Sequence, residues 1–357
     1  MGGLEYGGPS RGPAVSSWGV RDRLARVARR WEAARAGLTV HDVAPSSPEF
    51  QAALRALPET PLRPVELYQQ LFEPRSDTPK WALLFEERGV PVAAIGARFV
   101  WDRWEPLTHW IVPGIPFPVR TADYSRVLQA VGLPLAVAGW RCGAPPALGP
   151  RAAVTTGATH GAPTATDFEA YWKASGHLHT VRQARARCGR FQLVVDPPGG
   201  AAWVIRNSGA KWREPAGVTE DRVVAAEWLE RQRRYHTLML LEGERRIAGL
   251  TFLVDGCDVV SHHTFRDPGF ERLKVGTYLT DQAFAWARSA GFENIDLGGG
   301  FDYKIRWVPT AGQKYSLRLT PWYAAAGARL RAWWSWARPA APFPAVPLDP
   351  APHGHAT

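Results

Sequence analysis

Apolar and polar positions alternate along the first half of the chain with the periods of helices and strands. Over residues 21–37 apolar side chains recur every three or four positions with arginines between them, which predicts an amphipathic helix. Two apolar runs, Trp81–Glu86 and Val90–Phe99, flank a turn at Gly89 and predict a β-hairpin. A short helix over 123–131 and a strand over 133–138 are expected to follow.

The second half carries the clearer pattern. Apolar positions at helical spacing, with Thr166 or Asp167 as the first cap, predict four helices, beginning near residue 168 and over 177–188, 220–235 and 278–290. Apolar runs between glycine turns predict strands over 191–196, 237–241, 246–254, 258–265, 294–297 and 314–320. A tryptophan-rich helix over 324–337 is expected to pack against the domain or form a dimer contact, and the oligomeric state is left open.

The domain organisation follows from length and from segments with little to pack. A chain of 357 residues is long for one hydrophobic core, so two domains are expected. Alanine, glycine, proline and threonine dominate residues 151–166, which predicts a linker. The predicted parts are a flexible tail over 1–20, a first domain over 21–150, the linker over 151–166, a second domain over 167–323, and a C-terminal helix with a Pro/Ala tail over 324–357.

Composition narrows the class of protein. Apolar residues make up 45% of the chain and charged residues 21%, which is typical of a globular protein. No stretch of about 18 apolar residues occurs, so no membrane-spanning helix is predicted. The first residues have no apolar segment typical of a secretory signal. Because Cys142, Cys188 and Cys257 are too widely spaced for a disulfide framework or a zinc site, we expect a cytoplasmic protein.

The charge is strongly positive. Lysine and arginine total 43 against 33 acidic residues, which gives 43 − 33 = +10, and nearly all the basic residues are arginine. This charge favours anionic partners such as nucleotides, coenzyme A or tRNA, without choosing among them, and DNA is not expected as a partner.

A first candidate site is the start of the helix near residue 276. A glycine at a helix start leaves backbone N–H groups that can hold an anion. Arg272, Lys274, Gly276 and Thr277 could therefore bind the phosphates of an anionic donor. The alternative is a helix start with a solvated basic face, and on this segment alone that alternative is favoured. The arginines of the helix over 177–188 allow the same two interpretations.

A second candidate site follows the strand that ends near residue 297. Gly298, Gly299 and Gly300 allow a ligand or a second backbone to approach closely. Lys304 follows them, and its ammonium could stabilise the oxyanion that forms when an amine attacks an activated carbonyl. The alternative is a glycine-rich loop with a surface lysine.

Two residues could act as the general base. His262 and His263 are neighbours on a predicted strand, so one should face the core or a cleft, and we name His263 as the candidate. Asp302 is the second candidate, with an ion pair to Lys304 as its alternative role. A histidine whose ring is satisfied by backbone is the more common outcome. No third ligand stands at metal spacing, so no metal site is predicted.

Residues 167–323 resemble the Fem-like branch of the GCN5-related N-acyltransferase (GNAT) superfamily. The resemblance is carried by Phe168–Trp172, by the arginine-rich helix, by Gly276–Leu279 and by Asp296–Trp307 with its Tyr303-Lys304 pair. It implies an α/β (α+β) fold of two tandem GNAT-like domains, each a mixed, mostly antiparallel sheet flanked by helices. It also implies that the first domain is degenerate, that the second holds the ligand, and that Lys304 has the family lysine's role.

The resemblance implies an acyltransferase that moves an acyl group from acyl-CoA to a small-molecule amine, in secondary-metabolite or cell-envelope biosynthesis. Acyl-CoA is then a co-substrate, and no tightly bound cofactor is expected. Two alternatives stay open: an aminoacyl-tRNA-dependent transferase of the Fem type, and a non-catalytic binding or scaffold protein. The segment around Arg272 departs from the usual pyrophosphate loop by one residue, and no long tRNA-binding arm stands between Pro197 and Thr219.

Overall fold

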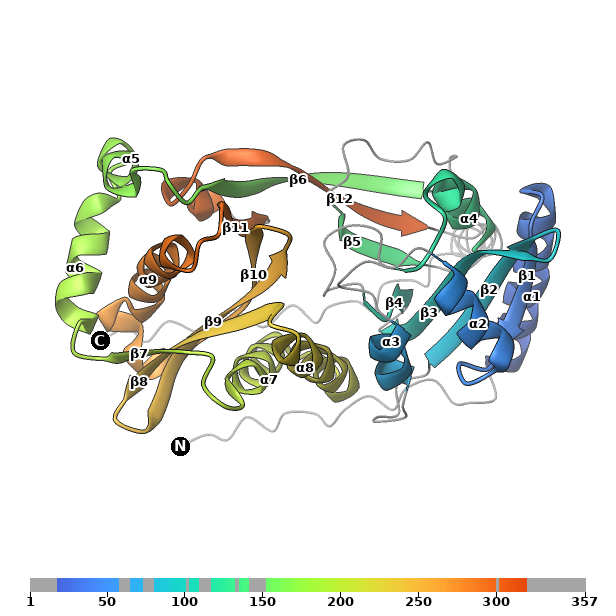
Figure 1. The fold of residues 1–357 in the computed structure, drawn as a ribbon, viewed down its shortest axis with the longest axis horizontal. Helices are drawn as coiled ribbons and strands as arrows, with labels where there is room; N and C mark the ends of the chain where they lie inside the picture. Colours follow the sequence, from blue (N-terminus) through green and yellow to red (C-terminus); the bar gives the residue numbers. More distant parts are fainter. Residues whose placement is uncertain are drawn as a thin grey trace, which may run out of the picture.

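A computed structural model gives the protein two sheets, each flanked by helices (Figure 1). It describes residues 18–57, 65–72, 80–100, 103–108, 117–131, 135–140, 152–299 and 302–319. The predicted α/β class with mostly antiparallel sheets is confirmed. Residues 1–17 of the predicted tail over 1–20 and the predicted helix over 324–337 lie outside the described residues, whereas residues 18–20 belong to a helix.

The first half is built on a four-stranded antiparallel sheet of order β1-β2-β3-β4. Its strands are β1 (Thr39–Val43), β2 (Lys80–Glu87), β3 (Val90–Val100) and β4 (Arg103–Pro106). Its helices are α1 (Trp18–Arg35), α2 (Pro48–Ala56), α3 (Val65–Phe72) and α4 (Tyr124–Ala130), the last preceded by the 3₁₀ turn η2 (Thr121–Asp123). The predicted hairpin is confirmed as β2–β3, and its turn residues Arg88 and Gly89 both have positive φ, as a tight hairpin turn requires.

The second sheet has eight strands in the order β5-β12-β6-β11-β10-β9-β8-β7. The strands are β5 (Ala136–Trp140), β6 (Ala152–Pro163), β7 (Gln192–Val195), β8 (Tyr235–Glu242), β9 (Arg245–Asp255), β10 (Asp258–Arg266), β11 (Asn294–Gly299) and β12 (Thr310–Leu319). All neighbours in this sheet pair antiparallel except β10 and β11, which are parallel. The sheet is therefore mixed, and its one parallel pair lies near its centre.

Helices cover both faces of the β7–β11 part of this sheet (Figure 1). They are α5 (Phe168–Ala174), α6 (Leu178–Cys188), α7 (Gly200–Trp212), α8 (Ala216–Arg231) and α9 (Val275–Ser289), with the short turns η3 (Pro268–Leu273) and η4 (Asp302–Arg306). One apolar core joins α5, α6 and α9 to the sheet, and a second joins α7 and α8 to it. Asp167 caps α5 by accepting a hydrogen bond from Ala170, as the sequence predicts.

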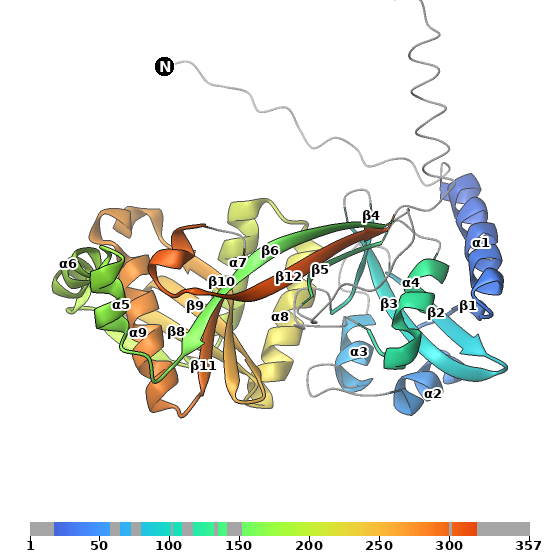
Figure 2. The same cartoon turned by 90° about the horizontal axis from the view of Figure 1, so that it is seen from above.

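The predicted linker over 151–166 is wrong, because most of it is strand β6. This strand pairs with β12 on one side and β11 on the other. Ladder hydrogen bonds come from the backbone, so a segment of Ala, Thr and Gly can hold a central strand without large apolar side chains. Viewed from above, β6 and β12 run from one half of the molecule to the other (Figure 2). The two halves are thus joined by continuous sheet.

Helix α7 was not predicted. It begins after Pro197-Pro198-Gly199 and contains Gly209, residues that hide a helical pattern in the sequence. A Cβ on Gly209 would lie 2.5 Å from Oγ1 of Thr219 on α8, so the glycine allows the two helices to cross closely.

Candidate active site

Strands β10 and β11 pair over only three residues before they separate. Their parallel ladder ends at Val260 and Asp296. Just beyond it, the register of β10 against β9 shifts between Ser261 and Thr264. The register of β11 against β6 also shifts, after Asp296. Two irregularities at one level of the sheet mark the place where the backbones of β10 and β11 no longer bond to each other.

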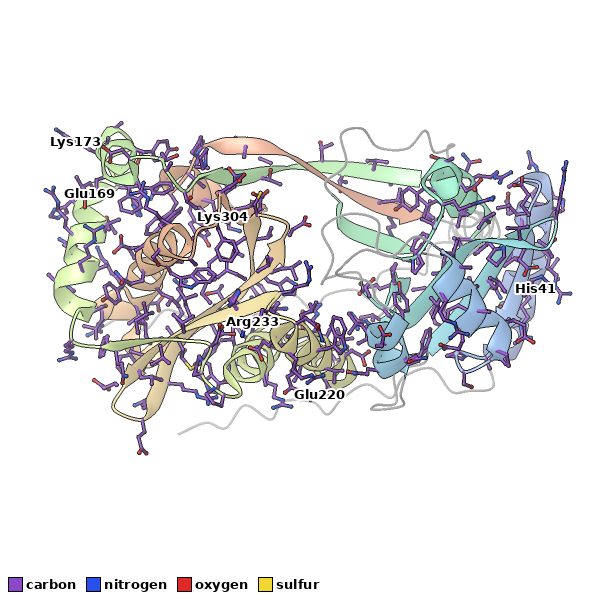
Figure 3. All side chains as sticks on the ribbon, viewed as in Figure 1. His41, Glu169, Lys173, Glu220, Arg233 and Lys304 are labelled. Atoms are coloured by element: carbon purple, nitrogen blue, oxygen red, sulfur yellow. The ribbon has the colours of Figure 1, made fainter. Side chains whose placement is uncertain are left out.

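Lys304 lies at this point of separation. Its Nζ donates a hydrogen bond to the carbonyl oxygen of Leu297 on β11, over 2.6 Å. A Cβ on Gly298 would be 3.7 Å from that Nζ and 3.6 Å from the carbonyl oxygen of Ser261 on β10. Gly298 has a φ of +74°, a conformation that favours glycine. The partly buried ammonium therefore lies beside β11 and close to the bulge of β10 (Figure 3).

The aromatic segment on α5 holds η4, which carries Lys304. Nε1 of Trp172 donates to the carbonyl oxygen of Trp307 over 3.0 Å, and the Tyr171 hydroxyl donates to that of Ile305 over 2.6 Å. The rings of Trp172 and Trp307 meet edge to face with centroids 5.4 Å apart. This explains why two distant segments, 168–172 and 302–307, belong to one site.

The predicted glycines have different environments. Gly298 donates its backbone N–H to Asp296, and Gly299 pairs with Thr159 of β6. Gly300 and the side chain of Asp302 lie outside the part of the chain that the structure describes. The role of Asp302 as a base stays a prediction.

His262 and His263 form the bulge of β10 between Ser261 and Thr264. Nε2 of His263 is buried and has no hydrogen-bond partner. Burial, with smaller effects of His262 and Arg222, holds the pKa of His263 well below its usual value. Both histidines are partly exposed as residues, and Nδ1 of His262 lies 2.8 Å from the hydroxyl of Tyr235. His263 is therefore neutral at physiological pH, and its Nε2 is not exposed to solvent.

An arginine that the sequence analysis did not identify lies against the start of α9. A Cβ on Gly276 would lie 2.9 Å from Nη1 of Arg266, so this guanidinium lies over the first turn of the helix. Arg266 is the last residue of β10, ten positions before Gly276. Its position at the end of a strand is the feature of the sequence that could have identified it as a site residue. Burial raises the pKa of the Tyr303 phenol on η4, and the charge of Arg266 partly opposes this rise.

The predicted anion-binding residues are only partly brought together. Lys274 caps α9 in the left-handed conformation, and its Nζ donates to Gln183 on α6 over 2.8 Å. Thr277 is in the first turn of α9 and partly buried. The exposed Arg272 lies on η3, and its carbonyl oxygen accepts a hydrogen bond from Arg187.

On the arginine-rich helix α6, Arg185 has a structural role. It binds Asp281 of α9 through two hydrogen bonds of 2.9 and 2.8 Å and also pairs with Glu169. Because these two carboxylates neutralise its charge, Arg185 is not part of a basic face that attracts a donor.

Part of the second half matches a known family. Residues 176–305 match the family model of an acetyltransferase (GNAT) domain. This segment is a GNAT domain. It contains Lys304, the bulge of β10 and the start of α9, and the superfamily predicted for the second half is thereby confirmed over this range. No curated protein matches the sequence.

Several solved structures are similar to most of the chain at low identity. The C-terminal domain of a lysylphosphatidylglycerol synthetase from Agrobacterium fabrum is 14% identical, with a TM-score of 0.45, over 80% of this chain and 95% of that one. FemX is 10% identical, with a TM-score of 0.41, over 82% and 99% of the two chains. A tandem GNAT protein from the clavulanic acid pathway is 11% identical, with a TM-score of 0.43, over 79% and 98%.

The described residues include no group of three His, Cys, Asp or Glu side chains arranged to hold a metal ion. Within the same residues, none of the helices combines the length and the apolar character needed to span a bilayer.

Proposed function

We propose that this protein is an acyltransferase that transfers an acyl group from acyl-CoA to an amine and forms an amide. The observation that carries the proposal is the position of the Lys304 ammonium, at the point where β10 and β11 separate within a GNAT domain. A cation fixed at that point can meet an acyl carbonyl that enters between the two strands.

In the proposed reaction the amine nitrogen attacks the thioester carbon. The carbonyl π electrons move onto oxygen, and the C–S bond breaks when the tetrahedral intermediate collapses. The amine proton passes to a base, and the CoA thiolate leaves. Lys304 stabilises the oxyanion, because negative charge develops on that oxygen only along the reaction path. No covalent intermediate with the protein is needed.

The start of α9 supports an anionic donor. The N–H groups of the first helical turn carry partial positive charge, and the guanidinium of Arg266 lies over the same turn. Together they form a site suited to the pyrophosphate of coenzyme A. The site combines Arg266 with the predicted Gly276 and Thr277, whereas Arg272 lies outside it on η3.

Arg266→Ala should weaken CoA binding at least about tenfold, because a charge-assisted hydrogen bond contributes roughly 1.5–3 kcal/mol. Isothermal titration calorimetry of CoA measures the change. Arg245→Ala is the matched control, since Arg245 is an exposed arginine of the same region that pairs with Asp267. Equal CoA affinity for Arg266→Ala and the wild type would place the phosphates elsewhere.

The choice of donor is tested by ligand-induced thermal stabilisation. Acetyl-CoA should raise the melting temperature of the full chain, because a ligand that binds only the folded state stabilises it. Stabilisation by aminoacyl-tRNA and not by acetyl-CoA would favour the Fem-type reaction. Stabilisation by neither would favour a binding or scaffold role.

A further inference from the structure

The short turn η4, which carries Lys304, ends in carbonyl groups that need donors from outside the turn. The N–H groups of Trp307 and Val308 both donate to the carbonyl oxygen of Lys304, over 2.9 and 3.1 Å. In an α-helix the carbonyl of Ile305 would accept from residue 309, but Pro309 has no N–H. The carbonyl groups that follow Lys304 are therefore left to side chains from another part of the fold.

Helix α5 supplies two of these donors. The Tyr171 hydroxyl donates to the carbonyl oxygen of Ile305 over 2.6 Å, and Nε1 of Trp172 donates to that of Trp307 over 3.0 Å. Burial raises the pKa of the Tyr171 phenol, so the hydroxyl keeps its proton and remains a donor at neutral pH. Neighbouring residues of one helix thus hold both ends of a three-residue segment that begins directly after Lys304.

Ser175, the residue after α5, makes a weaker contact with the middle of the segment. Its Oγ lies 3.2 Å from the carbonyl oxygen of Arg306 and 3.3 Å from that of Trp172. A hydroxyl has one proton, so Ser175 can donate to only one of these oxygens at a time. Tyr171 therefore makes the firmer contact of the two hydroxyl groups.

Helix α5 is itself anchored in the core of the second half. The ring of Phe168 lies 4.3 Å from that of Phe284 on α9, centroid to centroid, and the ring of Trp172 lies 5.8 Å from it. Trp172 is buried. Because α5 is packed in this way, its donors have fixed positions relative to α9 and the sheet.

We infer that Tyr171 is a positioning residue for Lys304: its hydroxyl fixes the backbone of η4 so that the lysine ammonium lies at the point where β10 and β11 separate. This inference rests on the proposed function and deepens it. A lysine side chain is long and flexible, so its ammonium keeps one position only when the backbone and the far end are both held. The Leu297 carbonyl holds the far end, and the bond to Ile305 holds the backbone one residue away.

The first test is independent of turnover. Tyr171→Phe keeps the ring and removes the hydroxyl. Hydrogen exchange measured by NMR reports on the amides of Trp307 and Val308, which donate to the carbonyl of Lys304. Both amides should exchange at least about threefold faster in Tyr171→Phe, because the turn opens more often. Unchanged exchange would overturn the inference whatever the protein's activity.

Tyr68→Phe is the matched control for this variant. Tyr68 lies in the first half, and its hydroxyl is 3.5 Å from Oγ1 of Thr108. Its replacement should leave the exchange of Trp307 and Val308 unchanged, and equal acceleration in both variants would overturn the inference. The melting temperature of Tyr171→Phe should change little, because Ile305 is 51% exposed and water can bond to its carbonyl in place of the hydroxyl.

The second test is a double-mutant cycle in single-turnover experiments with acyl-CoA and an amine acceptor. Tyr171→Phe should lower the rate about tenfold with donor affinity within about twofold, since a displacement of about 1 Å at a reacting centre can cost up to a hundredfold. In the Lys304→Met background the same change should cost less than about twofold, because its effect passes through Lys304. Equal losses in the two backgrounds would overturn the inference.

The two tests separate this inference from the proposed function. If the wild type transfers no acyl group while the exchange of Trp307 and Val308 rises in Tyr171→Phe, the positioning of Lys304 by Tyr171 stands and the proposed function fails. If the wild type is active and Tyr171→Phe costs the same with and without Lys304, the proposed function stands and the inference fails.

Discussion

Lys304→Met should lower turnover about a hundred- to a thousandfold, which corresponds to roughly 3–4 kcal/mol of transition-state stabilisation. Methionine keeps an unbranched apolar side chain and removes the ammonium. Because charge develops on the acyl oxygen only in the transition state, the affinity for the donor should change little. Lys304→Arg should restore little activity, since a planar guanidinium cannot reproduce the compact charge held beside Leu297. Single-turnover rates with saturating donor measure the effect.

Lys173→Met is the matched control for this experiment. Lys173 is an exposed lysine on α5, and Figure 3 shows it at the edge of the same half of the molecule. Its replacement should leave the rate within about threefold, as expected for a solvated surface charge. Thermal melting of Lys304→Met separates lost chemistry from lost structure, because Lys304 also binds the backbone of β11. A near-wild-type rate for Lys304→Met would remove Lys304 from the reaction.

Asp221→Ala should destabilise the protein by about 3–5 kcal/mol, the usual cost of leaving a buried charge without its partner. Asp221 on α8 accepts Lys80 of β2 over 2.8 Å and Arg98 of β3 over 3.2 Å. The carboxylate is 1% exposed, and Arg98 already has two buried nitrogens without a hydrogen-bond partner. Removing Asp221 would leave two cations buried where the halves of the molecule meet. Urea unfolding measures the loss.

The neighbouring residue provides the control. Glu220 pairs with Arg206 through two hydrogen bonds of 2.8 Å, but both side chains are exposed. Figure 3 shows Glu220 at the end of α8 that faces the first half. Glu220→Ala should cost no more than about 1 kcal/mol, because water screens an exposed pair. Equal losses for the two variants would show that the contact between the halves does not depend on the buried ion pair.

Sequence patterns were most informative where a segment buries one face. The β2–β3 hairpin and the cap of α5 were predicted, because alternation, turn residues and caps are local signals. The composition of strand β6 predicts a linker, because the strand is stabilised by backbone pairing with β11 and β12, which no local composition reveals. Helix α7 was missed because its glycines serve a close crossing with α8.

In the candidate site, too, local features could be predicted from the sequence and features that depend on tertiary contacts could not. The spacing of the glycines and Lys304 pointed to one loop, and the structure places Lys304 where β10 and β11 separate. Arg266 and Tyr235 were not predicted, because a helix start and a strand bulge bring them to the site from distant positions in the chain. The orientations of His262 and His263 could not be predicted from alternation, since a bulge breaks the two-residue period of a strand.

The most direct test of the central claim is a crystal structure of the full chain with a thioether analogue of acyl-CoA, which cannot transfer its acyl group. We expect the acyl carbonyl oxygen within hydrogen-bond distance of Nζ of Lys304, between β10 and β11, and the pyrophosphate at Arg266 and the start of α9. An analogue bound with its carbonyl away from Lys304, or no bound analogue at saturating concentration, would contradict the account.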